Sequence, residues 1–195
     1  MNLSFEQEIK HYLADNRIPF HDGSASFKDL DFMLPDFADA RPFRFDAKEK
    51  RQKYNMNNWK TTIPEQHLFI MDDLAARKIL AYAPRSAMIV RNNILQNYVL
   101  FTILDLFLIP KQRANRVISK KVETLKGKWL IDLRNGPQFE SLNAVFAAIR
   151  DYLEAFQEIF LEKLECHGSF QGEDIDVQGI TRRPEHWQVD VAETR

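Results

Sequence analysis

Residues 43–48 place a carboxylate and an amine two positions apart. Their sequence is FRFDAK, in which apolar and charged residues alternate. Because alternate side chains of a β-strand point to opposite faces, Asp46 and Lys48 share one face with Arg44 while the aromatic rings face the core. A carboxylate binds a hard cation such as Mg²⁺, and a neighbouring ammonium group orients water or offsets developing negative charge. The pairing therefore suits hydrolysis of a phosphodiester bond.

The same chemistry requires a second acidic residue from a neighbouring strand. Asp31 is the preferred candidate, because it begins the run DFML and a turn-prone stretch rich in proline and aspartate then returns the chain toward Asp46. Asp29 and Asp36 are competitors. Asp29 would point to the same face of the strand as Asp31 but lies one step further out. Asp36 comes so late that almost no strand would remain between it and the turn. We therefore expect Asp31, Asp46 and Lys48 to face a common site.

This pattern resembles the PD-(D/E)xK nuclease superfamily, which includes type II restriction enzymes and archaeal Holliday junction resolvases. The matching residues are Asp31 in LDFML and the element Asp46-Ala47-Lys48. Glu6 also fits, because resolvase-like members carry a first-helix glutamate followed by two apolar positions, as this chain does. The chain departs from the family pattern in two places: leucine replaces the proline before Asp31, and Asp46 replaces the commoner glutamate.

The resemblance covers residues 4–90 in element order and implies a fold, a cofactor and a site. The fold would be restriction endonuclease-like, of the α/β (α+β) class, with a mixed sheet flanked by helices. Asp31, Asp46 and Lys48 would be catalytic, and Glu6, Asp31, Asp46 and the Ala47 carbonyl would bind Mg²⁺ or Mn²⁺. The substrate would be nucleic acid, with DNA favoured over RNA. A homodimer is a candidate assembly, because many members dimerise to cut two strands.

Two basic clusters follow these residues along the chain. Basic residues interleaved with aromatic and amide side chains suit contact with phosphates and stacking on bases. The candidates for nucleic-acid binding are Lys50, Arg51, Lys53, Trp59, Lys111, Arg113 and Arg116. Two alternatives stay open. The basic clusters could be solvated loops, as charge runs usually are, and Trp59 could be an aromatic side chain packed in the core. Gln66 lies where some nuclease relatives carry a glutamine, and it is otherwise an exposed residue at a helix start.

The surrounding sequence predicts the elements that would position these side chains. Helical spacing of apolar residues indicates helices, and short β-rich runs bounded by turn residues indicate strands. The expected order is a helix over residues 5–16, strands over 27–34 and 43–47, a helix over 64–82, strands over 87–90, 98–109 and 129–133, and a helix over 141–164. This order predicts a mixed sheet with helices on both sides. The nuclease-like domain would span residues 1–167, followed by a polar tail over 168–195, frayed or docked on the domain.

Composition sets broader limits. Of the 195 residues 45% are hydrophobic, which is enough for a core, and the formal net charge of -1 gives no overall electrostatic case for nucleic acid. A single cysteine, Cys166, excludes an intrachain disulfide and favours a reducing compartment. Neither a signal peptide nor an apolar run long enough to span a bilayer is evident, so we expect a soluble, cytoplasmic protein without a membrane partner.

The near-neutral charge leaves an alternative function open. The same fold could serve as a catalytically inactive module that binds nucleic acid or protein. Other chemistries find no support, because the histidines lack zinc spacing and the sequence holds no phosphate-cradling P-loop, dinucleotide fingerprint or G-x-S-x-G elbow. A third interpretation is a structural or interaction protein, in which Asp31, Asp46 and Lys48 would lie too far apart to share an ion.

Overall fold

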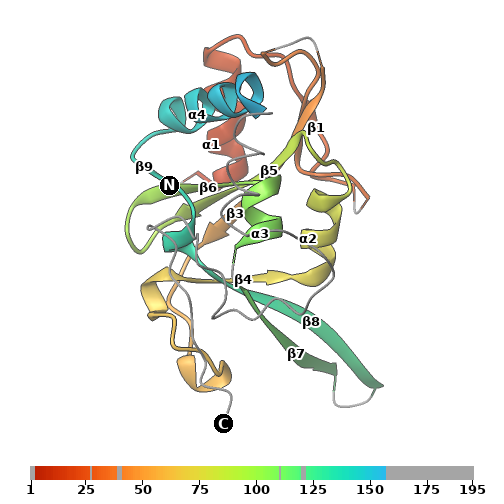
Figure 1. Cartoon of the computed structure of the whole chain (residues 1–195), viewed down its shortest axis with the longest axis vertical. Coiled ribbons are helices and arrows are strands. Elements are labelled where there is room, and N and C mark those ends of the chain that lie inside the picture. The colour runs from red at the N-terminus through yellow and green to blue at the C-terminus, as the bar shows by residue number, and fades with distance from the viewer. Residues whose placement is uncertain (1–2, 27, 39–40, 110, 120–121, 157–195) are drawn as a thin grey trace, which may run out of the picture.

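The computed structural model describes residues 3–26, 28–38, 41–109, 111–119 and 122–156 (Figure 1). A six-stranded mixed sheet has the strand order β1-β2-β3-β5-β6-β9, and an antiparallel sheet of three strands has the order β4-β8-β7. Within the described ranges, no helix has the length and apolar character that a membrane span requires. The predicted C-terminal tail, residues 168–195, lies outside the described residues.

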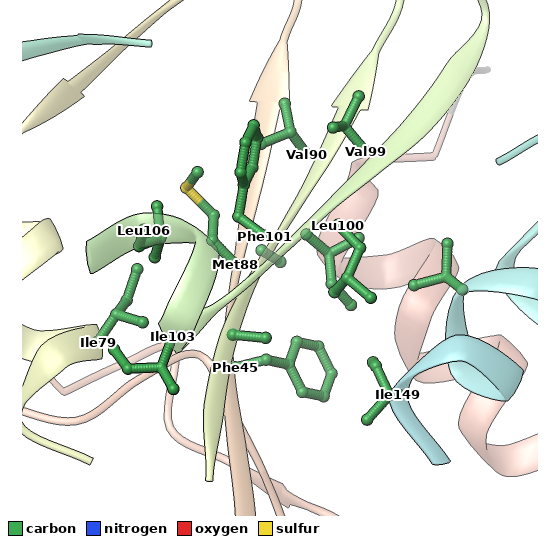
Figure 2. Packing of buried hydrophobic residues seen from close by; sticks show 14 of the residues in the cluster. Phe45, Ile79, Met88, Val90, Val99, Leu100, Phe101, Ile103, Leu106 and Ile149 are labelled. Atoms are coloured by element: carbon green, nitrogen blue, oxygen red, sulfur yellow. The ribbon is translucent and has the colours of Figure 1, made fainter. Parts of the chain in front are cut away.

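Helices lie on both faces of the larger sheet. In Figure 2, Ile79 and Ile103 approach the sheet from one side and Ile149 approaches it from the other. The expectation of a mixed sheet flanked by helices is therefore confirmed. In chain order the elements are α1 (Phe5–Asp15), β1 (His21–Asp22), β2 (Phe32–Leu34), β3 (Phe43–Lys50), the 3-10 turns η1 (Met56–Asn58) and η2 (Glu65–His67), β4 (Leu68–Asp72), α2 (Asp73–Leu80), β5 (Ser86–Asn92), β6 (Asn97–Thr102), α3 (Ile103–Leu108), β7 (Lys111–Ser119), β8 (Val122–Asp132), the 3-10 turn η3 (Leu133–Asn135), β9 (Gln138–Phe139) and α4 (Leu142–Glu154).

The first helix forms where the sequence predicts it. Ser4 accepts a hydrogen bond from the Gln7 backbone N–H, and the Gln7 side chain accepts one from the Ser4 N–H, so the two residues form a capping box. Phe5, Ile9 and Leu13 then lie on one buried face. The last helix was expected to reach residue 164. Instead α4 ends at Glu154, and the residues from 157 onward lie outside the described part of the chain.

The pairing of β2 with β3 fixes the register of the two strands that carry the predicted site. They are antiparallel, with Phe32 opposite Phe45, and the two rings stack at a centroid distance of 5.0 Å. Both rings are fully buried, and Phe146 of α4 packs edge-on against Phe45 at 5.8 Å. An aromatic pair adds about 0.5–1.5 kcal/mol beyond its buried area. On the expected first strand, only Phe32–Leu34 is regular among the described residues.

Two predicted elements are wrong in part. The helix expected over residues 64–82 contains a strand, because Leu68–Asp72 pairs with β8 and only Asp73–Leu80 is helical. The strand expected over 98–109 ends at Thr102, whose hydroxyl accepts a hydrogen bond from the Asp105 N–H. The Asp105 carboxylate accepts a hydrogen bond from the Thr102 N–H in return. This second capping box begins α3. Backbone pairing partners decide between helix and strand in such short apolar runs.

The strand expected at residues 129–133 is the end of a longer hairpin. β8 pairs with β7 from Lys111 onward, and β7 forms an edge of the three-stranded sheet. No strand was expected over residues 111–119, because their sequence is basic and only weakly apolar. The basic residues of this cluster follow helix α3 and not a strand, and β7 carries them at an edge of the three-stranded sheet.

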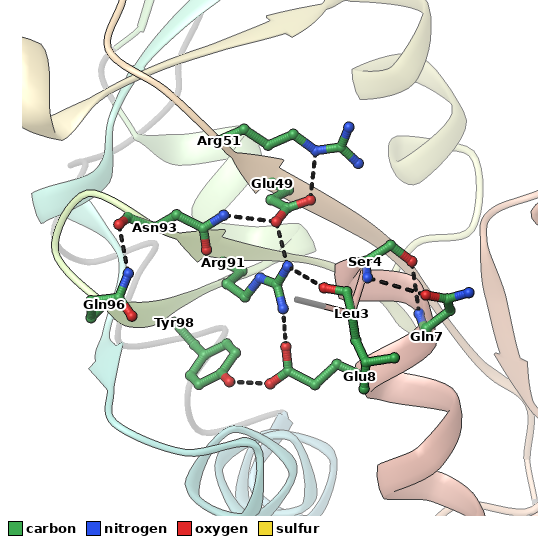
Figure 3. Close-up of polar contacts among 10 residues, drawn as sticks. All are labelled: Leu3, Ser4, Gln7, Glu8, Glu49, Arg51, Arg91, Asn93, Gln96 and Tyr98. Atoms are coloured by element: carbon green, nitrogen blue, oxygen red, sulfur yellow. Dashed lines mark hydrogen bonds and ion pairs between the residues drawn. The ribbon is translucent and has the colours of Figure 1, made fainter. Parts of the chain in front are cut away.

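A network of partly buried charges ties α1 to the larger sheet (Figure 3). The Arg91 guanidinium on β5 makes ion pairs with Glu8 of α1 and Glu49 of β3, and the Tyr98 hydroxyl donates a hydrogen bond to Glu8. The Asn93 side chain donates a further hydrogen bond to Glu49, at 2.7 Å. Burial alone would raise the pKa of Glu49, but these hydrogen-bond donors outweigh it and lower the pKa. Arg91 is therefore the shared cation of two carboxylates.

We expect Arg91→Met to lower the free energy of unfolding by about 1–3 kcal/mol, because the 10%-exposed Glu49 carboxylate keeps Arg51 and Asn93 but loses one of its two cations. Chemical denaturation at pH 7 measures this loss. The matched control is Arg77→Met, whose side chain is 72% exposed and pairs with Asp73 on the surface. The control should change stability by less than about 0.5 kcal/mol. Equal effects of the two substitutions would contradict the role given to Arg91.

Candidate active site

The structure brings Asp31, Asp46 and Lys48 together on one face of the larger sheet. The Lys48 Nζ lies 2.6 Å from Asp46 Oδ2 and 3.5 Å from Asp31 Oδ2. Asp46 and Lys48 alternate with Phe45 and Ala47 along β3, as strand geometry requires, and they face α2. The expectation that the three groups face a common site is confirmed by these distances. An arrangement with the three groups far apart, as in a purely structural protein, is not found.

Asp31 is held in place by the backbone of the neighbouring strand. Its Oδ2 accepts a hydrogen bond of 2.8 Å from the Ala47 N–H. The Phe32–Phe45 register, extended by one residue, sets Asp31 opposite Asp46. Of its two competitors, Asp29 lines the same pocket but is exposed, and Asp36 is exposed and absent from the residues that line the pocket. The structure thus favours Asp31, as the sequence did.

Burial and like charge make the Asp46 carboxylate costly to ionise. Its side chain is 6% exposed, and burial, with the Asp31 carboxyl beside it, raises the pKa of Asp46 to about 7 despite the opposing effect of Lys48. Burial alone would lower the pKa of Lys48, but the carboxylates of Asp46 and Asp31 outweigh it and raise the pKa. Lys48 is therefore charged at neutral pH, and its Nζ donates to both carboxylates.

A small pocket of ≈ 200 Å³ opens over these groups. Its lining includes Asp31, Asp46, Lys48 and, from α2, Ala75 and Lys78. Lys78 is half-buried, and its Nζ lies 3.5 Å from the Asp29 carbonyl oxygen; among the described residues it has no carboxylate partner. Sequence reasoning missed Lys78, because it placed this helix without knowing which of its faces meets β3.

The donor set suits a hard divalent cation. Two carboxylates face each other across adjacent strands, and Mg²⁺ is commonly held by one or two carboxylates together with water and substrate phosphate. The predicted third ligand, Glu6, is on α1 and is absent from the pocket lining. Across the described ranges, no group of three or more His, Cys, Asp or Glu side chains is arranged to hold a metal ion. The structure therefore assembles two of the three predicted acidic ligands.

The predicted nucleic-acid contacts divide into several groups. Lys50 is 1% exposed, and its Nζ pairs with Glu65 at 2.8 Å and lies 3.9 Å from the centre of the Tyr54 ring. This burial argues against a phosphate contact by Lys50. Arg51 and Lys53 are exposed. Gln66 is exposed in η2 and absent from the pocket lining.

The remaining candidates lie near or on the three-stranded sheet. Trp59 and Arg113 line one groove, although they are 54 positions apart in the sequence. Trp59 is half-buried and packs on a small core, so the packed-aromatic alternative holds for part of its surface. Lys111 and Arg116 lie on β7 at the sheet edge; their side chains are outside the described part of the structure.

A second cavity, of ≈ 960 Å³, lies on the other face of β3 and is lined by the Arg91 network (Figure 3). Its carboxylates, Glu8 and Glu49, are paired with Arg91. Two acidic groups and their shared cation satisfy each other there, whereas Asp31 and Asp46 share one partly exposed lysine. The smaller pocket therefore remains the stronger candidate for chemistry.

Comparisons with known proteins identify one structural likeness. No protein-family model matches the sequence, and no curated protein matches it. Among solved structures, the chain is similar to D212, a nuclease from a fusselovirus, with a TM-score of 0.40 and 11% sequence identity over 76% of this chain and 87% of that chain. At this level of similarity, the likeness assigns neither a family nor an activity.

We expect Asp46→Asn to stabilise the metal-free protein at pH 8 by about 1–3 kcal/mol. The folded protein keeps the Asp46 proton up to a pKa of about 7, while the unfolded chain releases it near about 3.9. The wild-type protein therefore loses stability as pH rises from the unfolded to the folded pKa of Asp46, because the unfolded chain releases this proton first. The variant has no carboxyl group at this position and does not lose it. Chemical denaturation in EDTA between pH 4 and pH 8 measures the difference.

Asp22→Asn is the matched control. Lys10 and Ser24 lower the pKa of Asp22 to about 2 by hydrogen bonds, so its contribution has the opposite sign and is lost as pH falls. The control variant should be no more stable than the wild type at pH 8. An Asp46→Asn variant that is less stable than the wild type at pH 8 would contradict the electrostatic account of the site.

Proposed function

We propose that this chain is a metal-dependent nuclease that hydrolyses phosphodiester bonds, with DNA as the first substrate to test. The single observation that carries the proposal is the convergence of Asp31, Asp46 and Lys48 on one pocket, where the ammonium nitrogen lies within 3.5 Å of both carboxylates. Such clusters of acids with a perturbed pKa are typical of catalytic sites. A homodimer and a cytoplasmic location stay predictions.

The chain's own residues would divide the work as follows. Asp31 and Asp46 would hold Mg²⁺ or Mn²⁺, with the Ala47 carbonyl as a further ligand. When bound, the ion supplies Lewis-acid stabilisation of charge on the phosphate. Lys48, charged at neutral pH, would donate hydrogen bonds that orient the attacking water and offset negative charge as the phosphorus–oxygen bond breaks. Lys78 would attract the phosphate to the pocket.

One observation favours a second candidate, a module that binds nucleic acid without cleaving it. Among the described residues, no third acidic side chain joins Asp31 and Asp46 in an arrangement that could hold a metal ion, and Lys48 occupies both carboxylates. In such a module, the ammonium group would replace the metal ion as the counter-charge. The two candidates differ in one measurable respect, because only the nuclease requires a divalent cation.

We expect the purified protein to cut DNA in the presence of Mn²⁺ or Mg²⁺ and not in EDTA. Lys48→Ala should reduce the single-turnover cleavage rate at least about 100-fold, because it removes the preorganised charge beside the reacting phosphate. Arg77→Ala is the matched control, since Arg77 also pairs with one aspartate, at 2.7 Å, but is 72% exposed and absent from the residues that line this pocket. Wild-type protein that cuts neither DNA nor RNA with either ion would reject the nuclease.

A separate readout tests the cation itself. Mn²⁺ should raise the midpoint of thermal unfolding of the wild type, because a ligand that binds only the folded state stabilises it by mass action. Asp31→Asn should abolish this shift while the protein remains folded. An equal shift in wild type and variant would remove Asp31 from the ligand set, whatever the cleavage assay gives.

Lys78→Ala should raise the KM for DNA about 10-fold and change kcat less, because the side chain lies at the pocket without an acidic partner of its own among the described residues. Steady-state cleavage measures both constants. Arg77→Ala is the control from the same helix, since its side chain is 72% exposed and pairs with Asp73. Matching KM values in both variants would mean that Lys78 does not contact the substrate.

A further inference from the structure

We propose that Arg44 binds a second phosphate of the nucleic-acid strand, next to the phosphate that reacts over Asp46 and Lys48. The inference rests on the proposed function and deepens it, because it names the substrate that the pocket accepts best. That substrate is a strand with a further phosphate on the Arg44 side of the reacting bond. Arg44 adjoins the pocket and is absent from its lining, so it is a substrate-binding residue and not a catalytic one.

Strand geometry places Arg44 on the same face of the larger sheet as the candidate site. Arg44, Asp46 and Lys48 are alternate residues of β3, and alternate side chains of a strand share a face. The guanidinium carbon of Arg44 lies over the ring of Tyr82, 4.5 Å from its centre. Tyr82 follows directly after α2, the helix that carries Lys78 to the pocket. Arg44 and the pocket therefore lie on the same side of the sheet.

The spacing along both elements is close to the length of one nucleotide. A strand advances about 3.3 Å per residue, so the backbone at Arg44 lies about 6.6 Å from the backbone at Asp46. On the helix side, Tyr82 follows Lys78 by four residues, which is about one helical turn. The Tyr82 N–H donates a hydrogen bond to the Ile79 carbonyl, so the turn continues past the end of α2. Successive phosphates of an extended strand could therefore lie at Asp46 and at Arg44.

The surroundings of Arg44 leave its charge available to an anion. Its register partners in the sheet are Met33 of β2 and Ser86 of β5, and neither is charged. The side chain is half-buried, and within the described ranges the guanidinium has no carboxylate partner. Lys50, on the same strand, pairs with Glu65 instead. A phosphate would supply the counter-charge that the neighbours of Arg44 do not.

Tyr82 holds the guanidinium in place before a ligand arrives. A guanidinium that lies over an aromatic ring is attracted by the face of the ring, while its N–H groups point outward in its own plane. A side chain that is already ordered loses less conformational entropy on binding. Two parallel N–H groups match two phosphate oxygens, which makes this one of the stronger kinds of hydrogen-bonded pair. Because every nucleotide carries the same phosphate, the contact recognises the backbone and not the base sequence.

The cleavage test compares two substrates that differ by one phosphate. The dinucleotide TpT has one phosphodiester, whereas TpTpT has two, so only TpTpT can place a second phosphate at Arg44. In Mn²⁺ we expect the wild type to cleave TpTpT with a kcat/KM per bond about 10-fold above that for TpT. Arg44→Gln should reduce this preference to less than about 2-fold. A general loss of activity would lower both rates and leave their ratio unchanged.

A binding test needs no cleavage. In EDTA, the fluorescence anisotropy of a labelled thymidine oligonucleotide of about 12 nucleotides gives the affinity at a series of salt concentrations. The slope of log affinity against log salt concentration changes by about 0.7 for each phosphate contact of a single strand. Arg44→Gln should reduce the slope by this amount. Arg44→Lys keeps the positive charge and should keep the slope, which separates loss of the phosphate contact from loss of packing on Tyr82.

Arg150→Gln is the matched control. The Arg150 guanidinium carbon also lies over an aromatic ring, 4.9 Å from the centre of Phe37, but Arg150 belongs to α4. Figure 2 shows Ile149 of α4 on the face of the sheet opposite to Ile79 of α2. The control should change neither the preference for TpTpT nor the salt slope. Equal losses in the two glutamine variants would overturn the proposal.

The outcome is separable from that of the nuclease. A salt slope that falls in Arg44→Gln, without cleavage by the wild type in Mn²⁺, supports the phosphate contact and rejects the nuclease. Cleavage that depends on Lys48, with a salt slope indifferent to Arg44, rejects the Arg44 contact alone. A slope that falls while the preference for TpTpT persists would place the bound phosphate away from the reacting one, and would also reject the proposal.

Discussion

The candidate site depends on the register of β2 and β3, which the stacked rings of Phe32 and Phe45 determine. They hold β2 and β3 in the register that sets Asp31 opposite Asp46, and the Ala47 N–H then secures the Asp31 carboxylate. A slip of one residue would turn every side chain of β2 to the other face, so Phe32 would leave the core that it shares with Phe45. The hydrophobic core therefore specifies the position of two like charges that would otherwise repel each other.

Charged side chains on β3 show two different ways to bury a charge. Glu49 accepts hydrogen bonds from Arg91 and Asn93 that stabilise its anion, and the pKa of Glu49 falls accordingly. Asp46 is as deeply buried, yet its pKa rises to about 7 because its environment disfavours the anion even with Lys48 adjacent. A fold keeps such a cost when the site has a use for it, and a bound cation would relieve it.

The sequence predicted those parts of the molecule whose signals are local. The alternation of FRFDAK placed Asp46 and Lys48 correctly, and the cap at Ser4 placed the first helix. Other outcomes depended on tertiary partners that no local pattern identifies. Residues 68–72 are a strand because β8 pairs with them, and Lys50 is buried because Glu65 and Tyr54 enclose it. The start of α3 was readable in principle, since Thr102 and Asp105 have the spacing of a capping box.

The three-stranded sheet is connected to the pocket through α2. Arg113 of β7 lies over the ring of Trp129 on β8, and the Trp129 Nε1 donates a hydrogen bond of 2.8 Å to Asp73, the first residue of α2. The same helix carries Lys78 to the pocket that Asp46 lines. Because paired strands and a packed helix deform little, this chain of contacts fixes the three-stranded sheet relative to the pocket. The position of Lys78 at the pocket therefore depends on the smaller sheet as well as on β3.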